Sequence, residues 1–219
     1  MIRRIKRLLS FSKEQTHKYV PKGKPDAIIL AAGMLGKKIL FPKALFEHGG
    51  KTAIEHQISV MRPLVGKIII ACHESERKEI AKHIDYLGGI EFSTEIRLLG
   101  TAGATKKAVE NSKANSFIVC NVDDLTDIDL NSLIDFGPDT MCVSNPRLSF
   151  GVLETDGFDV RQYKEKPMMR NIWANCGLYF LTRKTVENFP ERGSLEHDVW
   201  PYVRMKAFKH FGMWKTFGK

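Results

Sequence analysis

Two segments of the chain carry side chains that could bind a nucleotide and a metal ion, and each follows a short apolar run. The first is AAGMLGKKILFPKAL, residues 31–45, which follows AIIL. Its candidate phosphate-binding residues are Ala31, Ala32, Gly33, Gly36, Lys37, Lys38 and Lys43. The small residues would let a phosphate chain approach the backbone, the second glycine suits an anion-binding turn, and the lysines supply positive charge. The segment matches neither the GxxxxGK[ST] loop nor the GxGxxG motif, so by itself it also fits an ordinary tight connection.

The second segment places two carboxylates directly after the apolar run SFIVC. Asn121 and Val122 lead into Asp123 and Asp124. A carboxylate at the end of a strand, facing a lysine-rich loop, suits a Mg²⁺ ion that bridges phosphate oxygens. An aspartate here could equally cap the turn that follows. Spacing alone leaves both interpretations open.

The elements that position these segments follow an α/β pattern. Short apolar runs predict strands at AIIL, KIIIAC, SFIVCN, DTMCVSN, FGVLET and NCGLYFL. Residues 52–62 and 74–86 read as helices between the first three strands. This alternation predicts a mainly parallel central sheet with helices on both faces, which is a three-layer, Rossmann-like α/β fold. Ligands of such folds bind at the carboxyl ends of the strands, where both segments above are expected to lie.

Composition excludes several other classes of protein. The 219 residues are 43% hydrophobic, and no apolar run approaches the ~20 residues of a membrane-spanning helix. Four cysteines, Cys72, Cys120, Cys142 and Cys176, form no CxxC pair, and each lies in or beside an apolar run. We expect reduced core thiols, which fits a cytoplasmic protein.

Most of the net charge of +9 belongs to the N-terminus. Residues 1–24 hold eight Lys or Arg and one acid, Glu14, for a local charge of +7, which leaves 9 − 7 = +2 elsewhere. We therefore expect a basic extension at residues 1–25 and a folded domain at 26–219. The extension lacks the interleaved aromatic residues of single-strand binders, so no nucleic-acid partner is expected. A solvated terminus is the favoured interpretation; a basic helix that touches anionic lipid or a partner, and a transit peptide, are alternatives.

Seven segments of the chain occur in an order that, taken together, points to one protein family. They are AIILAAG with PKAL, GGKTAIEHQI, LLGTAGA, FIVCNVDDLTDIDL, FGVLETDGFDVRQYKEKP, NCGLYFL and SLEHDVWP. Together they span Ala27 to Pro201 and resemble the sugar-1-phosphate nucleotidyltransferases, also called NDP-sugar pyrophosphorylases. The mannose-1-phosphate guanylyltransferase and glucose-1-phosphate nucleotidyltransferase types look most similar. The resemblance implies a nucleotidyltransferase domain, and a helix at SLEHDVWP.

The resemblance also implies a role for each matching residue. It assigns nucleotide binding to Ala31, Ala32, Gly33, Gly100, Thr101, Ala102 and Gly103. It assigns sugar-phosphate and sugar binding to Glu165, Lys166 and Asn175. The catalytic residues that it implies are Lys43, Asp123 and Lys166, with Asp123 as the Mg²⁺ ligand.

Two departures from the family pattern put activity in doubt. The family's first loop normally contains an Arg that binds the triphosphate, whereas this chain has GMLGKK, so Lys37 or Lys38 would have to replace it. Lysine lacks the bidentate geometry of arginine. Near the C-terminus, Trp214 is followed two residues later by Thr216 where the family often has a second metal-binding Asp. A neutral hydroxyl binds Mg²⁺ more weakly than a carboxylate does.

The implied reaction joins a nucleoside triphosphate and a sugar 1-phosphate, giving an NDP-sugar and pyrophosphate with Mg²⁺ as cofactor. One alternative is a catalytically weak or inactive paralogue that binds sugar nucleotides as a regulatory subunit. A second is a cytidylyltransferase that acts on a non-sugar phosphate. A homo-oligomer is compatible with all three, and the sequence specifies neither the base nor the sugar.

Overall fold

The computed structural model describes residues 19, 23–35 and 41–217. Most of the predicted N-terminal extension lies outside the described residues, as do Lys37 and Lys38. Tyr19 belongs to the described part and packs edge-on against Phe180, with the ring centroids 6.0 Å apart. Among the helices of the described part, none is long and apolar enough to cross a membrane.

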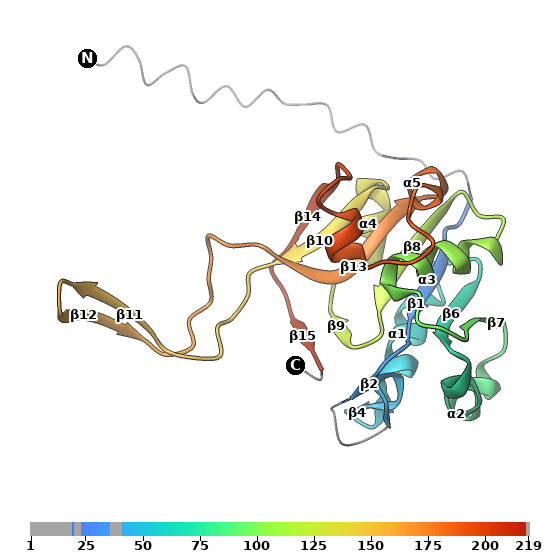
Figure 1. Cartoon of the computed structure of the whole chain (residues 1–219), viewed down its shortest axis with the longest axis horizontal. Helices are drawn as coiled ribbons and strands as arrows, with labels where there is room; N and C mark the ends of the chain where they lie inside the picture. Colours follow the sequence, from blue (N-terminus) through green and yellow to red (C-terminus); the bar gives the residue numbers. More distant parts are fainter. Residues whose placement is uncertain (1–18, 20–22, 36–40, 218–219) are drawn as a thin grey trace, which may run out of the picture.

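A seven-stranded sheet forms the centre of the protein, in the order β14-β10-β13-β8-β1-β6-β7 (Figure 1). Its strands are β1 (Asp26–Leu30), β6 (Ile68–His73), β7 (Ile90–Glu95), β8 (Ser116–Asn121), β10 (Thr140–Ser144), β13 (Ala174–Thr182) and β14 (Lys206–His210). β8, β1, β6 and β7 are parallel neighbours, and β14 is parallel to β10. β13 runs antiparallel between β8 and β10. The predicted α/β fold with a mainly parallel sheet is confirmed.

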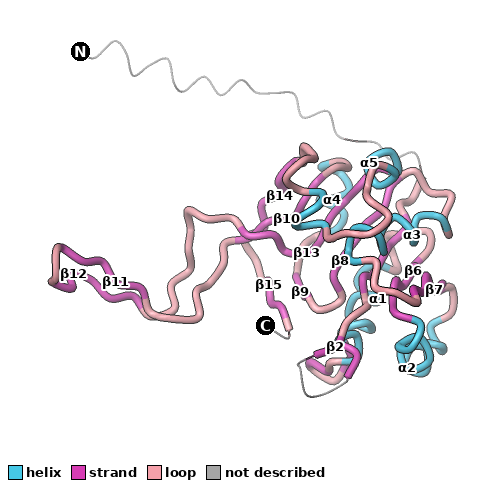
Figure 2. Tube along the Cα trace, viewed as in Figure 1, coloured by secondary structure: helices cyan, strands magenta, loops and turns pink. Residues whose placement is uncertain are grey.

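Helices cover both faces of this sheet, as the tube in Figure 2 shows. The helices are α1 (Ala53–Met61), α2 (Glu74–Ile84), α3 (Gly100–Glu110), α4 (Leu130–Phe136) and α5 (Arg183–Glu187). Short 3-10 turns occur at Lys43–Leu45 and Asp85–Leu87, and a π-helical turn at Leu195–Val199. The helix predicted at SLEHDVWP is therefore a single five-residue turn.

Strand alternation explains why the sheet needs two covering layers. In β1, Ala27 and Ile29 pack into a core with α1, α2 and α4, whereas Ile28 and Leu30 pack into a second core with α3 and α5. Successive side chains of a strand point to opposite faces, so a strand that is apolar throughout requires apolar partners on both sides. The run DAIIL, buried at every position, is such a strand.

The pattern of apolar runs did not predict the two edge strands, β7 and β14. β7 reads IEFSTE and β14 reads KAFKH, and both are only partly buried. A strand at the edge of a sheet is covered less completely than a central one, so its sequence carries no continuous apolar signal.

Besides the central sheet, the described residues form four two-stranded sheets. They are β2 (Met34–Leu35) with β3 (Phe41–Pro42), β4 (Glu47–His48) with β5 (Lys51–Thr52), β9 (Asp124–Thr126) with β15 (Trp214–Thr216), and β11 (Val152–Asp156) with β12 (Asp159–Lys164). The last of these is an antiparallel hairpin that contains the predicted strand FGVLET, which lies outside the central sheet. It lies at the end of a long projection, residues 145–173, that extends away from the body in Figure 1 and is called the arm below.

Candidate active site

The carboxyl ends of β1 and β8 lie side by side and bring the two candidate segments together. Leu30 pairs with Asn121, and the N–H of Val122 donates to the carbonyl of Leu30 at 3.1 Å. The chain after β1 returns at Lys43, whose N–H donates to the carbonyl of Gly33 at 3.1 Å. Lys43 and Asp123 then form an ion pair, with Nζ 3.1 Å from Oδ1. Two of the three predicted catalytic residues therefore meet at this edge of the sheet.

Asp123 and Asp124 have different partners. The carboxylate of Asp124 accepts hydrogen bonds from Asn121 Nδ2 at 2.9 Å and from Trp214 Nε1 at 3.2 Å. Both contacts join β8, β9 and β15, so the observed role of Asp124 is to stabilise the fold. Asp123 faces Lys43 instead, at the position from which a carboxylate could reach a metal ion on the phosphates.

Thr216 lies on β15 directly opposite Asp124, and Phe217 donates its N–H to the carbonyl of Asp123 at 2.9 Å. The hydroxyl oxygen of Thr216 is buried and has no hydrogen-bond partner among the described residues. Position 216 thus adjoins the aspartate pair, as the family pattern implies, but it contributes a neutral oxygen.

A cavity of about 220 Å³ opens beside this ion pair, between the end of β1 and the start of α3. Its lining contains five of the predicted residues, which are Ala32, Gly33, Lys43, Gly100 and Thr101. It is completed by Leu30, Ala71, Glu95, Leu98 and Ala104. Whole-ligand sites usually measure ~300–1,000 Å³, so this cavity suits a part of a nucleotide such as its base.

Three further predicted nucleotide-binding residues lie away from the cavity surface. Ala31 is fully buried in the core and donates its N–H to the carbonyl of Ala71 at 2.8 Å. Ala102 is also fully buried, and its N–H donates to the carbonyl of Gly193 at 3.0 Å. Gly103 faces the carbonyl of Glu191, which a Cβ would overlap. These three residues therefore pack within the protein and do not line the cavity.

Gly100 has a backbone role as well as a place in the lining. Its φ is +74°, and a Cβ would overlap the carbonyl of Gly193. The N–H of Gly193 donates to the carbonyl of Leu99 at 2.8 Å. A glycine is required here because α3 begins in contact with the loop before the π-helical turn.

Two acidic residues of the site, Glu76 and Glu95, are not part of any predicted motif. Glu76 is 2% exposed, and its carboxylate accepts the N–H of Gly33 at 3.2 Å and of His73 at 3.1 Å. The end of β1 is thus tied to the start of α2, and the Gly33 N–H is already bonded. Glu95, 4% exposed, lines the cavity and accepts the N–H of Leu99 at 3.1 Å. The segment EFSTE gives no sequence signal for this role, because Ser93 and Thr94, the neighbours of Glu95, are polar.

The predicted sugar-binding residues are not gathered at Lys43 and Asp123. Glu165 and Lys166 follow β12 on the arm, where both side chains are exposed and Glu165 accepts a hydrogen bond from the Tyr163 hydroxyl. Asn175, at the start of β13, donates to the Tyr179 hydroxyl at 2.6 Å and accepts the N–H of Gly177 at 2.9 Å. Its amide therefore already has partners within the chain.

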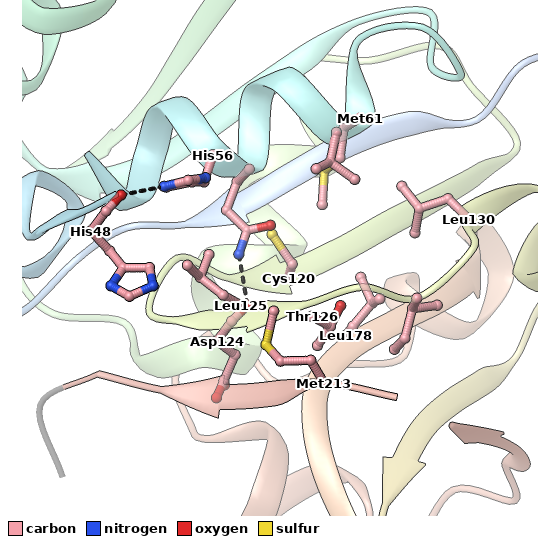
Figure 3. A pocket seen from close by; sticks show the side chains of 13 residues that line it. His48, His56, Met61, Cys120, Asp124, Leu125, Thr126, Leu130, Leu178 and Met213 are labelled. Carbon is pink, nitrogen blue, oxygen red and sulfur yellow. Dashed lines mark hydrogen bonds between the residues drawn. The ribbon is translucent and has the colours of Figure 1, made fainter. Parts of the chain in front are cut away.

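A second cavity, of about 150 Å³, lies between α1 and β9 (Figure 3). Its lining is mainly apolar, with His48 and Leu130 at opposite ends. His56 Nε2 lies 2.7 Å from the carbonyl of His48, and Gln57 Nε2 donates to the carbonyl of Asp124 at 2.7 Å. Because its polar groups are largely bonded to the chain, this cavity shows no arrangement suited to phosphate or metal chemistry.

The cysteines do not supply a nucleophile. All four are free and buried, as the sequence predicted. Burial raises the pKa of Cys72 and of Cys176 to about 12, and it raises the pKa of Cys120 further. A thiol in this state is protonated near neutral pH and unreactive.

The donor set near Asp123 fits a Mg²⁺ ion that arrives with its substrate. Across the described residues, no group of three or more His, Cys, Asp or Glu side chains could hold a metal ion. Mg²⁺ often uses only one or two carboxylates and completes its shell with phosphate oxygens and water. Asp123 is placed to supply one carboxylate, and its neighbourhood is compatible with such an ion.

Comparisons with known proteins agree with this geometry. Residues 27–134 match the family model of the MobA-like NTP transferase domain. The crystal structure of HddC from Yersinia pseudotuberculosis complexed with GMP-PN superposes with a TM-score of 0.66 at 25% identity, covering 89% of this chain and 94% of that one. Fold and site thus define a nucleotidyltransferase-type α/β protein.

Curated relatives narrow the assignment. The probable mannose-1-phosphate guanylyltransferase 3 of Arabidopsis thaliana is 26% identical over 81% of this chain, and the chain spans 61% of that protein's length. The D-glycero-alpha-D-manno-heptose 1-phosphate guanylyltransferase of Campylobacter jejuni is 27% identical over 83% of this chain and 88% of its own. Over about four fifths of its length the chain is therefore similar to sugar-phosphate nucleotidyltransferases.

Proposed function

We propose that this protein transfers GMP from GTP to a sugar 1-phosphate, giving a GDP-sugar and pyrophosphate. The observation that carries the proposal is the Lys43–Asp123 ion pair, which lies at the carboxyl ends of β1 and β8 beside the cavity that contains Glu95. Such a site offers one cation and one metal-binding carboxylate to phosphates, and an enclosed surface to a base.

The chemistry requires alignment and charge neutralisation more than proton transfer. A phosphate oxygen of the sugar 1-phosphate attacks the α-phosphorus, the bond to the β-phosphate oxygen breaks, and pyrophosphate leaves. The nucleophile is already anionic, so no general base is needed. A Mg²⁺ ion at Asp123 would neutralise charge on the phosphates. Lys43 would stabilise the negative charge that develops on the leaving group.

Guanine is the base that the cavity favours. Glu95 is buried in the lining, and one of its oxygens accepts a backbone hydrogen bond from Leu99. A carboxylate can accept two N–H donors side by side, and guanine carries such a pair on its Watson–Crick edge. Uracil, thymine and cytosine lack that pair. The two curated relatives described above are named as guanylyltransferases, which supports the same base.

The sugar phosphate would be held by Lys166 with Glu165, and the sugar by Asn175. These three roles rest on the family resemblance. We place the reaction in the cytoplasm, because four free buried thiols fit a reducing compartment. None of the named relatives or neighbours favours the regulatory-subunit alternative.

A pyrophosphate-release screen tests the proposal. The four nucleoside triphosphates would be combined with a panel of hexose and heptose 1-phosphates and Mg²⁺. We expect release only when both substrates are present, with GTP at least about tenfold better than ATP, CTP or UTP, a difference of ~1.4 kcal/mol. Binding of GDP-sugars without release in any combination would contradict the enzymatic proposal and favour a binding protein.

A further inference from the structure

The arm, residues 145–173, makes few contacts with the body that carries it. Among the described residues, the hydrogen bonds and ion pairs of residues 148–167 all end within the arm. β11 and β12 form a separate two-stranded sheet that is exposed along nearly its whole length. An isolated hairpin of this kind is marginally stable in water, so its sheet requires a partner surface.

The register of the hairpin separates an apolar face from a polar one. Leu153 pairs with Tyr163 and Thr155 with Val160, so these four side chains share one face. Leu153, Val160 and Tyr163 are 52%, 59% and 60% exposed. The opposite face carries the pair Glu154 and Gln162, with Lys164 bonded to Glu154 at 3.1 Å. An amphipathic sheet with an uncovered apolar face is the pattern of a docking element.

The two segments at the base of the arm are bonded to each other. Met169 donates its N–H to the carbonyl of Pro146 at 2.9 Å, and Leu148 donates to the carbonyl of Pro167 at 3.1 Å. The amide of Asn145 donates to the carbonyl of Ile172 at 2.8 Å. These bonds join the two segments at the base of the arm to each other, so they hold the shape of the arm itself and do not tie it to the body.

The nucleotide site has an apolar rim of its own. Leu98 lines the cavity and is more than half exposed, with Ile96 exposed beside it and Phe41 exposed two residues before Lys43. Glu165 and Lys166 directly follow β12 on the arm, which extends away from the body that carries the cavity (Figure 1). Lys166 also has φ of +43°, an uncommon backbone conformation for a residue other than glycine and one often found at functional sites.

We propose that two copies of this chain exchange arms, so that the arm of one copy covers the nucleotide site of the other and delivers Glu165 and Lys166 to it. This inference rests on the proposed function, because it assigns the sugar-phosphate site to residues of both copies. In a two-fold exchange each copy donates one arm and receives one arm. The same contact between an arm and a nucleotide site therefore occurs twice in the dimer.

The area available is sufficient for a stable dimer. Phe150, Phe158 and Tyr163 are exposed on each arm, and an aromatic side chain buries on the order of 150–250 Å². If Leu153 and Val160 are buried as well, and the received arm covers a similar area of the body, each copy would bury an area on the order of the roughly 800 Å² per partner of a standard interface.

The mass of the protein in solution gives the first test. We expect the wild type to sediment as a dimer, Leu153→Lys as a monomer, and the matched control Gln162→Lys, on the opposite face, as a dimer. Both variants should keep the wild-type circular dichroism spectrum, because both positions are on the arm. A monomeric wild type, or a dimer that resists Leu153→Lys, would overturn the inference.

Cross-linking locates the arm without relying on activity. The native thiols are buried, so a benzophenone maleimide should label Lys166→Cys selectively. Irradiation should give a covalent dimer, with the label joined to the partner's residues near Phe41, Lys43 or Leu98, and Leu153→Lys should abolish it. Cross-links confined to one chain would show instead that the arm closes on its own site.

Mixing two inactive variants tests whether each active site is built from residues of both copies. Lys166→Ala and Asp123→Asn should each be nearly inactive alone, and an equal mixture after subunit exchange should recover roughly a quarter of wild-type turnover, because half the dimers are mixed and one of their two sites is complete. An active wild type without recovery in the mixture would refute arm exchange. An inactive wild type whose cross-link joins two chains would refute the proposed reaction and leave the exchange standing.

Discussion

The Nζ atom of Lys43 lies 3.1 Å from Oδ1 of Asp123, although the two residues are 80 positions apart in the chain. Asp123→Asn keeps the shape of the side chain but removes the anionic metal ligand. We expect turnover to fall by at least about a hundredfold, because charge neutralisation at the phosphates is then lost. Steady-state pyrophosphate release measures the change, and the melting temperature should stay within a few degrees of the wild type.

Asp124→Asn is the matched control for that variant. Asp124 accepts hydrogen bonds from Asn121 and Trp214, so its loss should lower stability by roughly 1–3 kcal/mol, whereas the remaining activity per folded molecule should exceed that of Asp123→Asn. The reverse ranking of the two activities would mean that Asp124 is the metal ligand.

Glu95→Gln should weaken the preference for guanine. The amide keeps one acceptor oxygen but replaces the other with a donor, so one of the two guanine N–H groups meets an N–H instead of an oxygen. We expect kcat/KM for GTP to fall by about ten- to a hundredfold, a change of ~1.4–2.7 kcal/mol, while that for ATP changes little. An equal loss for both nucleotides would show that Glu95 supports only the backbone at Leu99.

The fold was largely predictable because its central strands are buried on both faces. AIIL, KIIIAC and SFIVCN are continuous apolar runs, and they became β1, β6 and β8. The edge strands β7 and β14 were not predictable in this way, because their exposed positions admit polar residues. Helix α3 was missed too: its glycines mark a loop in most sequences, but here they allow close packing against residues 191–193.

The site was predictable where it depends on strand ends and not where it depends on long-range contacts. The positions of Lys43 and Asp123 follow from the rule that parallel strands end at one edge. The hydrogen bond from the Gly33 N–H to the Glu76 carboxylate joins residues 43 positions apart, so no pattern of neighbouring residues predicts it. The position of Lys166 depends on the arm, whose two sides are joined by contacts between residues 145–148 and 167–172 that lie roughly 20 positions apart in the chain.

Thr216→Asp should lower the Mg²⁺ concentration needed for activity. Position 216 faces Asp124 and adjoins Asp123, and its present hydroxyl is buried without a partner. A carboxylate there would add a charged oxygen ligand, and a tenfold drop in the half-saturating Mg²⁺ concentration corresponds to ~1.4 kcal/mol. Thr216→Asn, of the same size but uncharged, is the control. Identical Mg²⁺ titrations for both variants would place the metal elsewhere.

Acid should remove part of the stability that the start of α1 provides. Hydrogen bonds, first from the N–H of Thr52, then from its hydroxyl and from Tyr86, lower the pKa of Glu55 below its ordinary value of 4.5. Ionised Glu55 therefore stabilises the fold above the pKa of the unfolded chain, and this contribution disappears as pH falls through the lower folded pKa. Urea unfolding of Glu55→Gln at pH 7 should show a loss of about 1 kcal/mol against the wild type.

At the acid end of a titration from pH 7 downward, the two proteins should differ less, because the wild-type carboxylate becomes protonated as the pH falls through its lowered folded pKa. Glu79→Gln, at an exposed ion pair on α2, is the comparison, and it should cost little at either pH. A difference for Glu55→Gln that is the same at both pH values would contradict the assignment of its stabilising effect to the ionised form.

Lys37 and Lys38 remain predictions, since both lie outside the described residues. If one of them replaces the missing arginine of the first loop, its change to Ala should remove a charge-assisted contact to the β- or γ-phosphate worth roughly 1.5–3 kcal/mol, or about ten- to a hundredfold in rate. Arg at the same position should preserve or raise the rate by restoring a bidentate contact. Kinetics of the Ala and Arg variants at each position measure this.

The comparison of these variants also separates the enzyme from a binding protein. In an active enzyme, the lysine that contacts the phosphates changes kcat, and its neighbour, one residue away with the same charge, serves as the matched control. In a binding protein neither lysine affects a rate, and only the affinity for the GDP-sugar changes. Two Ala variants that both match a clearly active parent would show that neither lysine takes the place of the arginine, and Lys43 would then carry the leaving-group charge with Mg²⁺ alone.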